Sequence, residues 1–267
     1  MNKMLLIFLI ILLTSCKSNQ DIVKSTNLSS PKIIEYFDSS RERKIPVAIY
    51  AESILTTKKM PVLIFSHGYG RNAPESNLSY AYLLENLAKT GYFVASIQHE
   101  LPTDDLVPLE GNPQVVRRPN WNRGAENILF VLKELQKYYP DLDYKKVIIS
   151  GHSNGGDMST LFTEMHPDLV WKLITLDQRR YAFPRISQPK IYSLRSSDQP
   201  ADTRVLPTLE EQNKFKMKIV ELSNTIHNDM DDGGTLTQKE EILKYFLEFL
   251  GENKNSGIEK IHREKIR

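Results

Sequence analysis

KVIISGHSNGG, residues Lys146–Gly156, is the stretch that predicts the fold of this chain. Val147–Ile149 are typical of a buried strand, and Ser153 follows at the apex of a turn, two residues from Gly151 and two from Gly155. In a G-x-S-x-G turn between a strand and a helix, the strained backbone lifts the serine hydroxyl out of the sheet. The flanking glycines avoid the clashes that Cβ atoms would cause there. Small residues typical of a helix start follow directly, so we expect Ser153 to be a nucleophile.

Composition limits the class of protein. The chain has 267 residues, of which 40% are hydrophobic and 25% are charged, which suits a globular domain with one sizeable core. A formal net charge of +2 gives no electrostatic reason to expect a nucleic-acid partner. Cys16 is the only cysteine, so no disulfide can form within the chain.

The first residues are expected to be a targeting segment. Met4–Leu13 is apolar, too short to span a bilayer comfortably, and has the length of a signal-peptide core. The following Leu-Thr-Ser-Cys resembles the lipobox of bacterial lipoproteins, which implies removal of residues 1–15 and acylation of Cys16, for example by palmitate. We therefore expect a lipid-anchored protein of the bacterial cell envelope, on the outer face of the inner membrane or on the outer membrane. Residues 16–30 would form a polar tether.

Residues 31–251 carry the pattern of one folded domain, and residues 252–267 that of a charged C-terminal tail. The expected strands are Ile33–Phe37, Ile45–Tyr50, Val62–Phe65, Tyr92–Ile97, Lys146–Ser150, Val170–Leu176, Lys190–Leu194 and Met217–Leu222. The expected helices are Ser79–Lys89, Asn122–Tyr139, Asp157–Met165, Leu209–Lys214 and Gln238–Leu250. Strands alternate with helices after an initial hairpin. The prediction is therefore an α/β fold with about eight strands, mostly parallel, and helices on both faces.

Polar residues follow the strands at the edge where such sheets hold their active sites. Ser153 follows one strand, Asp177 and Asp198 follow the next two, and His227 follows the last. A serine needs a base within hydrogen-bond reach to become a nucleophile, and His227 suits that role. A buried carboxylate would fix the tautomer of the histidine and stabilise its imidazolium form.

The turn after Val62–Phe65 is the second expected contribution to the site. It reads Ser-His-Gly-Tyr-Gly, and the backbone N–H groups of Tyr69 and Asn154 are expected to form an oxyanion hole. His67 would shape this turn and His152 would pack structurally, and His99, at the end of a strand, is a weaker candidate for lining the site. The long stretch Leu101–Trp121 is rich in proline and polar residues, so we expect a substrate wall there, with Trp121 or Arg118 near the mouth.

The segments VLIFSHGYG, VIISGHSNGGDMS and TIHNDM resemble an α/β-hydrolase. The double glycine after Ser153, the segment LDQRRYAFP and the late His-Asn-Asp-Met are similar to the platelet-activating-factor acetylhydrolase and dienelactone-hydrolase-like branch. In the acetylhydrolases the acid of the triad lies in an LD…FP segment, which maps onto Asp177. In most other α/β-hydrolases it follows the next strand, which maps onto Asp198. Both aspartates remain candidates, and Asp202 is a third.

The resemblance implies a serine hydrolase that cleaves carboxylic (acyl) esters through a Ser-His-Asp triad and an acyl-enzyme. An amidase or peptidase with the same triad is an alternative, as is a catalytically silent lipoprotein that only binds a ligand. The expected partners are a small-molecule acyl ester and, through the lipid anchor, a membrane. No Rossmann fingerprint, phosphate loop or metal-ligand spacing occurs in the sequence, so we expect neither a cofactor nor a metal.

Overall fold

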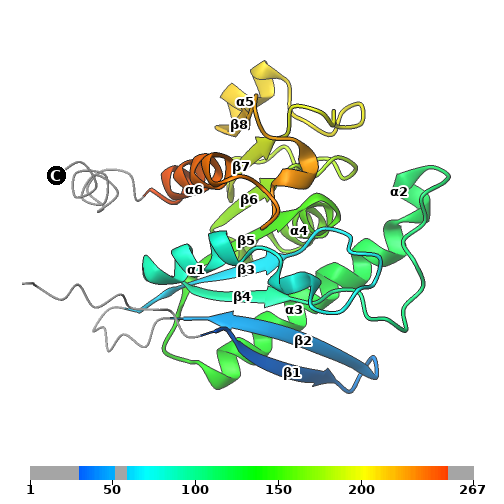
Figure 1. The fold of residues 1–267 in the computed structure, drawn as a ribbon, viewed down its shortest axis with the longest axis vertical. Coiled ribbons are helices and arrows are strands. Elements are labelled where there is room, and N and C mark those ends of the chain that lie inside the picture. Colours follow the sequence, from blue (N-terminus) through cyan, green and yellow to red (C-terminus); the bar gives the residue numbers. More distant parts are fainter. Residues whose placement is uncertain (1–29, 52–58, 252–267) are drawn as a thin grey trace, which may run out of the picture.

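The protein is described by a computed structural model that covers residues 30–51 and 59–251. Eight strands form one sheet in the order β1-β2-β4-β3-β5-β6-β7-β8 (Figure 1). The strands are β1 Lys32–Asp38, β2 Arg43–Tyr50, β3 Pro61–Ser66, β4 Phe93–Ile97, β5 Asp143–His152, β6 Lys172–Leu176, β7 Lys190–Arg195 and β8 Lys218–Glu221. β1 and β2 form an antiparallel hairpin against β4, and β3 to β8 run parallel. This arrangement confirms the expected fold class.

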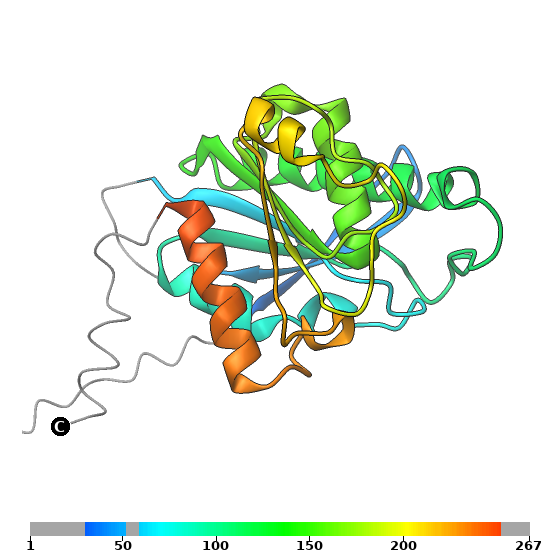
Figure 2. The same ribbon diagram turned by 90° about the horizontal axis from the view of Figure 1, so that it is seen from above.

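Helices cover both faces of the sheet, as Figure 2 shows from above. They are α1 Ala81–Lys89, α2 Pro113–Val116, α3 Arg118–Tyr138, α4 Ser153–Met165, α5 Leu209–Phe215 and α6 Leu236–Leu250. Apolar side chains of α1 and α6 pack into one buried cluster, and those of α3 and α4 pack into another on the opposite face. The two clusters lie on opposite faces of the sheet, so the middle strands are covered on both sides. Every residue of β4 and β6 is indeed buried.

Local sequence signals explain where several of these elements begin and end. α6 starts with a capping box, in which Thr235 and Gln238 each accept a backbone N–H of the other, and it ends at Gly251, whose φ is 88°. Two boundaries differ from the sequence prediction. α3 begins at Arg118, inside the stretch predicted as loop, and α4 begins at Ser153 itself. The serine turn is therefore also the first turn of the helix.

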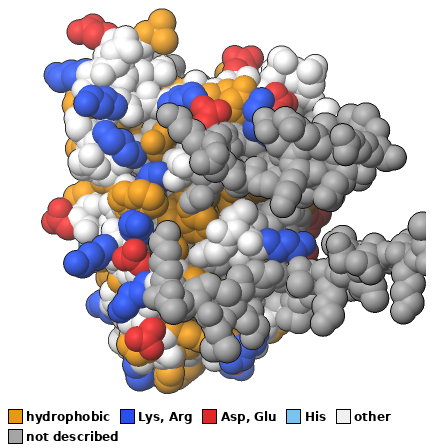
Figure 3. All heavy atoms as spheres, turned by 90° about the vertical axis from the view of Figure 1, so that its left-hand side faces the viewer, with side chains coloured by type: hydrophobic (Ala, Val, Ile, Leu, Met, Phe, Trp, Pro, Cys, Tyr) orange, Lys and Arg blue, Asp and Glu red, His pale blue; other side chains and the backbone are white. Residues whose placement is uncertain are grey.

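On the face that Figure 3 shows, basic and acidic side chains of the described residues are interspersed. No helix of the described residues is long and apolar enough to cross a membrane. The predicted signal peptide, Cys16, almost all of the tether and the C-terminal tail lie outside the described residues.

Candidate active site

The turn at Ser153 has the geometry that the glycine pattern predicts. Ser153 directly follows β5, opens α4 and has φ 51°, a left-handed conformation that is uncommon for a residue with a Cβ atom. A Cβ atom on Gly155 would lie 2.3 Å from the carbonyl oxygens of both Ser66 and His67. One on Gly151 would lie 2.5 Å from the carbonyl oxygen of Gly155. Only glycine lets α4 start this close to the end of β3.

The serine turn faces a histidine from the far end of the chain. The Oγ of Ser153 lies 2.9 Å from Nε2 of His227, which begins a short 3-10 turn after β8. The Nδ1 of the same ring lies 2.5 Å from Oδ2 of Asp177, the residue that follows β6. Both ring nitrogens are therefore engaged. A hydroxyl, an imidazole and a carboxylate in this order can move a proton from the serine to the histidine.

Asp177 is held as an ionised carboxylate. Its Oδ1 accepts the backbone N–H of Ser196 at 3.0 Å and lies 2.7 Å from the Arg195 guanidinium. Its Oδ2 accepts the hydroxyl of Ser196 at 2.7 Å in addition to the His227 ring. Burial by itself raises the pKa of Asp177, but the hydrogen bonds from His227 and Ser196 and the Arg195 charge together hold that pKa below its usual value.

The other two candidate acids lie away from the imidazole ring. Asp198, which the general pattern of the fold favours, accepts the backbone N–H of His227 at 2.7 Å. Asp198 therefore helps to position the main chain of His227. Its carboxylate contacts that main chain and neither of the ring nitrogens. Asp202 pairs with Arg180 at 2.5 Å. Of the aspartates that the sequence left open, Asp177 is thus the one that contacts the imidazole ring.

The two expected oxyanion donors lie beside Ser153. Tyr69 and Asn154 both line its cavity, and in the described part of the chain their backbone N–H groups have no hydrogen-bond acceptor. The Asn154 N–H belongs to the first turn of α4, where backbone donors lack intrahelical partners. Its side chain is fixed by the indole N–H of Trp121 at 3.0 Å and by Oε1 of Glu100 at 3.0 Å.

These contacts correct the expected role of Trp121 and Arg118 at the mouth. Trp121 is fully buried behind Asn154, and Arg118 contacts Tyr181 and Asn122 outside the cavity. The long stretch still contributes to the wall, through Leu109 and Arg117. Helical spacing places Trp121 on the apolar stripe of α3, and that stripe is the signal the sequence analysis missed.

His152 supports the site from the buried side. Its Nδ1 lies 2.8 Å from the Tyr80 hydroxyl, and that hydroxyl accepts the backbone N–H of Gly68 at 3.0 Å. Its ring packs 4.6 Å from the ring of His227. Burial, and then the proximity of His227, lowers the pKa of His152 to about 3. A neutral His152 adds no positive charge beside the imidazolium that His227 would form.

His67 and His99 lie deeper. The Nδ1 of His67 donates to the Gly68 carbonyl at 2.6 Å, and its Nε2 accepts the backbone N–H of His99 at 3.1 Å. His67 therefore braces the turn that carries Tyr69, as expected. His99 is buried, hydrogen-bonds to Ser66 at 2.9 Å and is not among the residues that line the cavity, so it is not a wall residue of the site. Burial holds the pKa of His99 well below its usual value.

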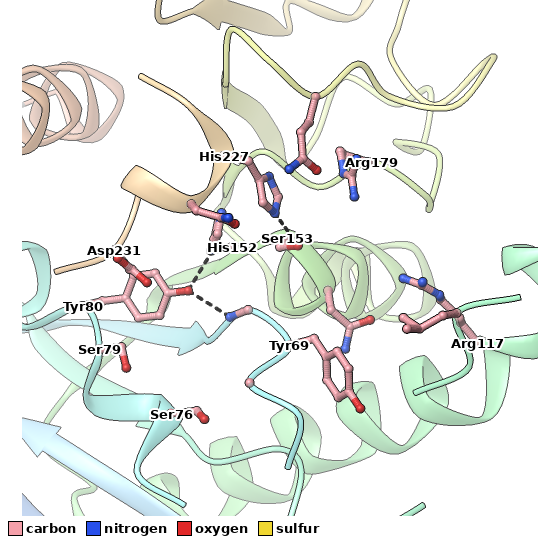
Figure 4. A pocket seen from close by; sticks show the side chains of 16 residues that line it. Tyr69, Ser76, Ser79, Tyr80, Arg117, His152, Ser153, Arg179, His227 and Asp231 are labelled. Atoms are coloured by element: carbon pink, nitrogen blue, oxygen red, sulfur yellow. Dashed lines mark hydrogen bonds between the residues drawn. The ribbon is translucent and has the colours of Figure 1, made fainter. Parts of the chain in front are cut away.

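The cavity at Ser153 has a volume of about 370 Å³ (Figure 4). This is within the range of small-molecule sites, at its lower end. Among the described residues that line it, Leu109 is the only aliphatic one. The polar and charged side chains of the wall include Ser76, Ser79, Arg117, Arg179, Gln199, Asn228 and Asp231. The two arginines were not assigned to the site from the sequence.

Comparison with known proteins supports the fold. The sequence matches no protein-family model and shows significant similarity to no curated protein. Among solved structures, the chain is similar to a thermostable esterase, with a TM-score of 0.54 and 17% identity over 73% of this chain and 54% of that one. The chain thus spans about half the length of that relative.

Two other likenesses are closer in shape. Esterase 2 of Thermogutta terrifontis, phosphonylated by cyclosarin, has a TM-score of 0.62 and 10% identity, over 86% of this chain and 97% of that one. The acylaminoacyl peptidase of Pyrococcus horikoshii has a TM-score of 0.60 and 14% identity, over 84% of this chain and 42% of that one. The sheet order and these likenesses together show that the chain has the α/β-hydrolase fold.

Proposed function

We propose that this chain is a serine hydrolase that cleaves carboxylic esters through an acyl-enzyme. The observation that carries the proposal is the line from the Ser153 hydroxyl to His227 and on to Asp177, with contacts of 2.9 and 2.5 Å, at a strained strand-to-helix turn. Several of the structures it is similar to are esterases, which supports the choice of an ester bond.

The geometry suits a two-step reaction. His227 Nε2 takes the proton of the Ser153 hydroxyl while Oγ bonds to the ester carbonyl carbon. The carbonyl oxygen becomes an oxyanion, for which the N–H groups of Tyr69 and Asn154 are the donors. When the tetrahedral intermediate collapses, the bond to the alcohol breaks and Nε2–H protonates the leaving oxygen. Water then attacks the acyl-enzyme by the same route, releasing the acid and restoring Ser153.

A fluorophosphonate probe tests this assignment, because it phosphonylates an activated serine. Wild-type protein should be labelled, Ser153→Ala should not, and Ser79→Ala should label like wild type because Ser79 lines the same cavity without facing His227. No labelling of the wild type, or equal labelling of Ser153→Ala, would favour a silent binding protein and overturn the proposal.

An amidase or peptidase remains the second candidate, because one of the similar structures is an acylaminoacyl peptidase. Ester and amide cleavage differ in the leaving group, since an amine must be protonated as it departs whereas a nitrophenolate leaves unaided. Paired p-nitrophenyl ester and p-nitroanilide substrates with the same acyl group separate the two activities. A turnover of the anilide close to that of the ester would favour the second candidate.

The start of the sequence extends the proposal to a membrane anchor. Acylation of Cys16 would attach the hydrolase to the bacterial envelope, with the following polar residues as a spacer. Metabolic labelling with a palmitate analogue tests this directly. The full-length chain should incorporate the label and Cys16→Ser should not, and an unlabelled wild type would contradict the anchor.

A further inference from the structure

Two arginines of the cavity stand on one side of Ser153. Arg117 lies between α2 and α3, and Arg179 follows β6, so distant parts of the chain bring them together. Figure 4 shows both guanidinium groups on the side of Ser153 opposite Tyr80 and Asp231. Charge is thus distributed unevenly around the serine, with cations on one side and a carboxylate on the other.

Neither arginine is neutralised by a close partner. Among the described residues, no carboxylate lies within ion-pair distance of Arg117 or Arg179. Other arginines of the same region are paired: Arg180 with Asp202 at 2.5 Å, Arg185 with Glu211 at 3.1 Å and Arg195 with Asp177 at 2.7 Å. The two arginines that line the cavity thus differ from these three in having no carboxylate at ion-pair distance among the described residues.

An exposed arginine needs no ligand, because water solvates its guanidinium. Arg117 and Arg179 differ from that case since both are partly buried. The Nε of Arg117 donates to the Pro108 carbonyl at 3.0 Å, which fixes the stem and leaves its outer N–H groups to the cavity. Burial is the main cause that lowers the pKa of Arg117; the charges of Arg180 and Arg179 lower it further, and those of Asp157 and Asp202 offset this only in part. The side chain stays protonated nonetheless.

We propose that the preferred substrates are esters that carry an anionic group near the scissile bond, bound by Arg117 and Arg179. This inference rests on the proposed ester hydrolysis. Two planar guanidinium groups match the geometry of a carboxylate or a phosphate, and their hydrogen bonds to an anion are among the strong ones. Asp231, on the other side of Ser153, would repel an anion. The anionic group of the substrate is therefore expected to lie toward the two arginines. The near absence of aliphatic wall residues disfavours long alkyl chains.

Matched esters provide the test. On the acyl side, the mono-p-nitrophenyl ester of glutaric acid is compared with p-nitrophenyl valerate, which has the same chain length but no charge. On the alcohol side, 4-acetoxybenzoate is compared with its methyl ester. Loss of a hydrogen bond to a charged group corresponds to about a 10- to 100-fold change. We expect wild-type kcat/KM to favour one of the charged esters over its neutral partner by at least about tenfold.

Variants connect this preference to the two side chains. In Arg117→Gln and Arg179→Gln, the ratio of kcat/KM for the charged and the neutral ester should fall about 10-fold or more, mainly through KM. Arg118→Gln is the matched control, because Arg118 neighbours Arg117 but lies outside the cavity. Competition by glutarate and by inorganic phosphate then distinguishes which anion the pair accepts. High salt should raise KM for the charged ester only.

The two levels of the proposal fail in different ways. If Ser153-dependent hydrolysis of the neutral esters occurs but neither charged ester is preferred, the anion site is wrong and the hydrolase assignment stands. A preference that survives both arginine substitutions also overturns the anion site. If wild-type protein hydrolyses none of the esters and takes up no fluorophosphonate, the hydrolase assignment itself fails.

Discussion

Replacement of Asp177 by asparagine is the sharpest test of the candidate triad. The carboxylate accepts four contacts: the Ser196 N–H and the Arg195 guanidinium on Oδ1, and the Ser196 hydroxyl and His227 Nδ1–H on Oδ2. An asparagine must turn its NH₂ group toward one of these two sets. Toward Arg195 and the Ser196 N–H it would meet only donors. Toward His227 and the Ser196 hydroxyl it meets groups that can also accept, so this orientation is favoured.

That orientation reverses the tautomer of His227. With an NH₂ group facing Nδ1, the ring must accept there and carry its proton on Nε2, where it can no longer take the proton of Ser153. A wrong tautomer in an analogous triad lowers kcat by about 10⁴-fold, and we expect a loss of about 10³- to 10⁴-fold here. The buried Arg195 also loses its counter-charge, so the free energy of unfolding should fall by about 3–5 kcal/mol.

Steady-state hydrolysis of a p-nitrophenyl ester measures the first effect, and urea unfolding measures the second. Asp198→Asn is the matched control. It keeps an oxygen that can accept the His227 backbone N–H, so kcat should stay within about tenfold of wild type. A folded Asp177→Asn with near-normal kcat, or a larger loss in Asp198→Asn than in Asp177→Asn, would refute the assignment of Asp177.

Three further predictions concern the frame of the site. Tyr80→Phe leaves the Gly68 N–H, beside the oxyanion turn, without its acceptor. The kcat for the ester should therefore fall about tenfold, and the free energy of unfolding in urea should fall by about 1–3 kcal/mol. An unchanged kcat would contradict this role. Gly155→Ala places a Cβ 2.3 Å from two backbone oxygens, so the free energy of unfolding, measured by thermal unfolding, should fall by more than about 3 kcal/mol. Gly91→Ala is the control: Gly91 has φ 96° with nothing near its Cβ position, so the loss there should be about 1–2 kcal/mol. Equal losses would argue against the close approach at Gly155. Burial raises the pKa of Asp157 to about 7, above its unfolded value, so its protonated form is favoured in the folded state. The free energy of unfolding of wild type, relative to Asp157→Asn, should therefore decrease by about 1.4 kcal/mol per pH unit between pH 4 and 7, and a pH-independent difference in urea titrations would refute this.

The sequence by itself determined the order of elements and most of the chemistry. Apolar runs of four to six residues, most of them followed by a helix, imply a mostly parallel sheet because a helix can carry the chain back to the start of the next strand. The glycines around Ser153 specify a turn whose geometry depends only on neighbours in the chain. His227 was identifiable since it is the first histidine after the last strand.

Tertiary structure decided which carboxylate meets the imidazole. Asp177 and Asp198 follow neighbouring strands and have the same chemistry, so no local pattern distinguishes them. Asp177 has φ 52°, a left-handed conformation that its flanking residues do not predict. Its carboxylate is oriented by Arg195 of the next strand and by Ser196, which follows that strand. Such contacts depend on strand register and side-chain direction, which are fixed only when the sheet is assembled.

The same reason applies to the wall of the cavity. Arg117 and Arg179 are unremarkable in sequence, where each neighbours another arginine. Only the packing of α3 against α4 and the path of the chain after β6 turn these two toward Ser153, while Arg118 and Arg180 find partners elsewhere. Local sequence thus specifies the reactive turn, and long-range packing selects the charges that surround it.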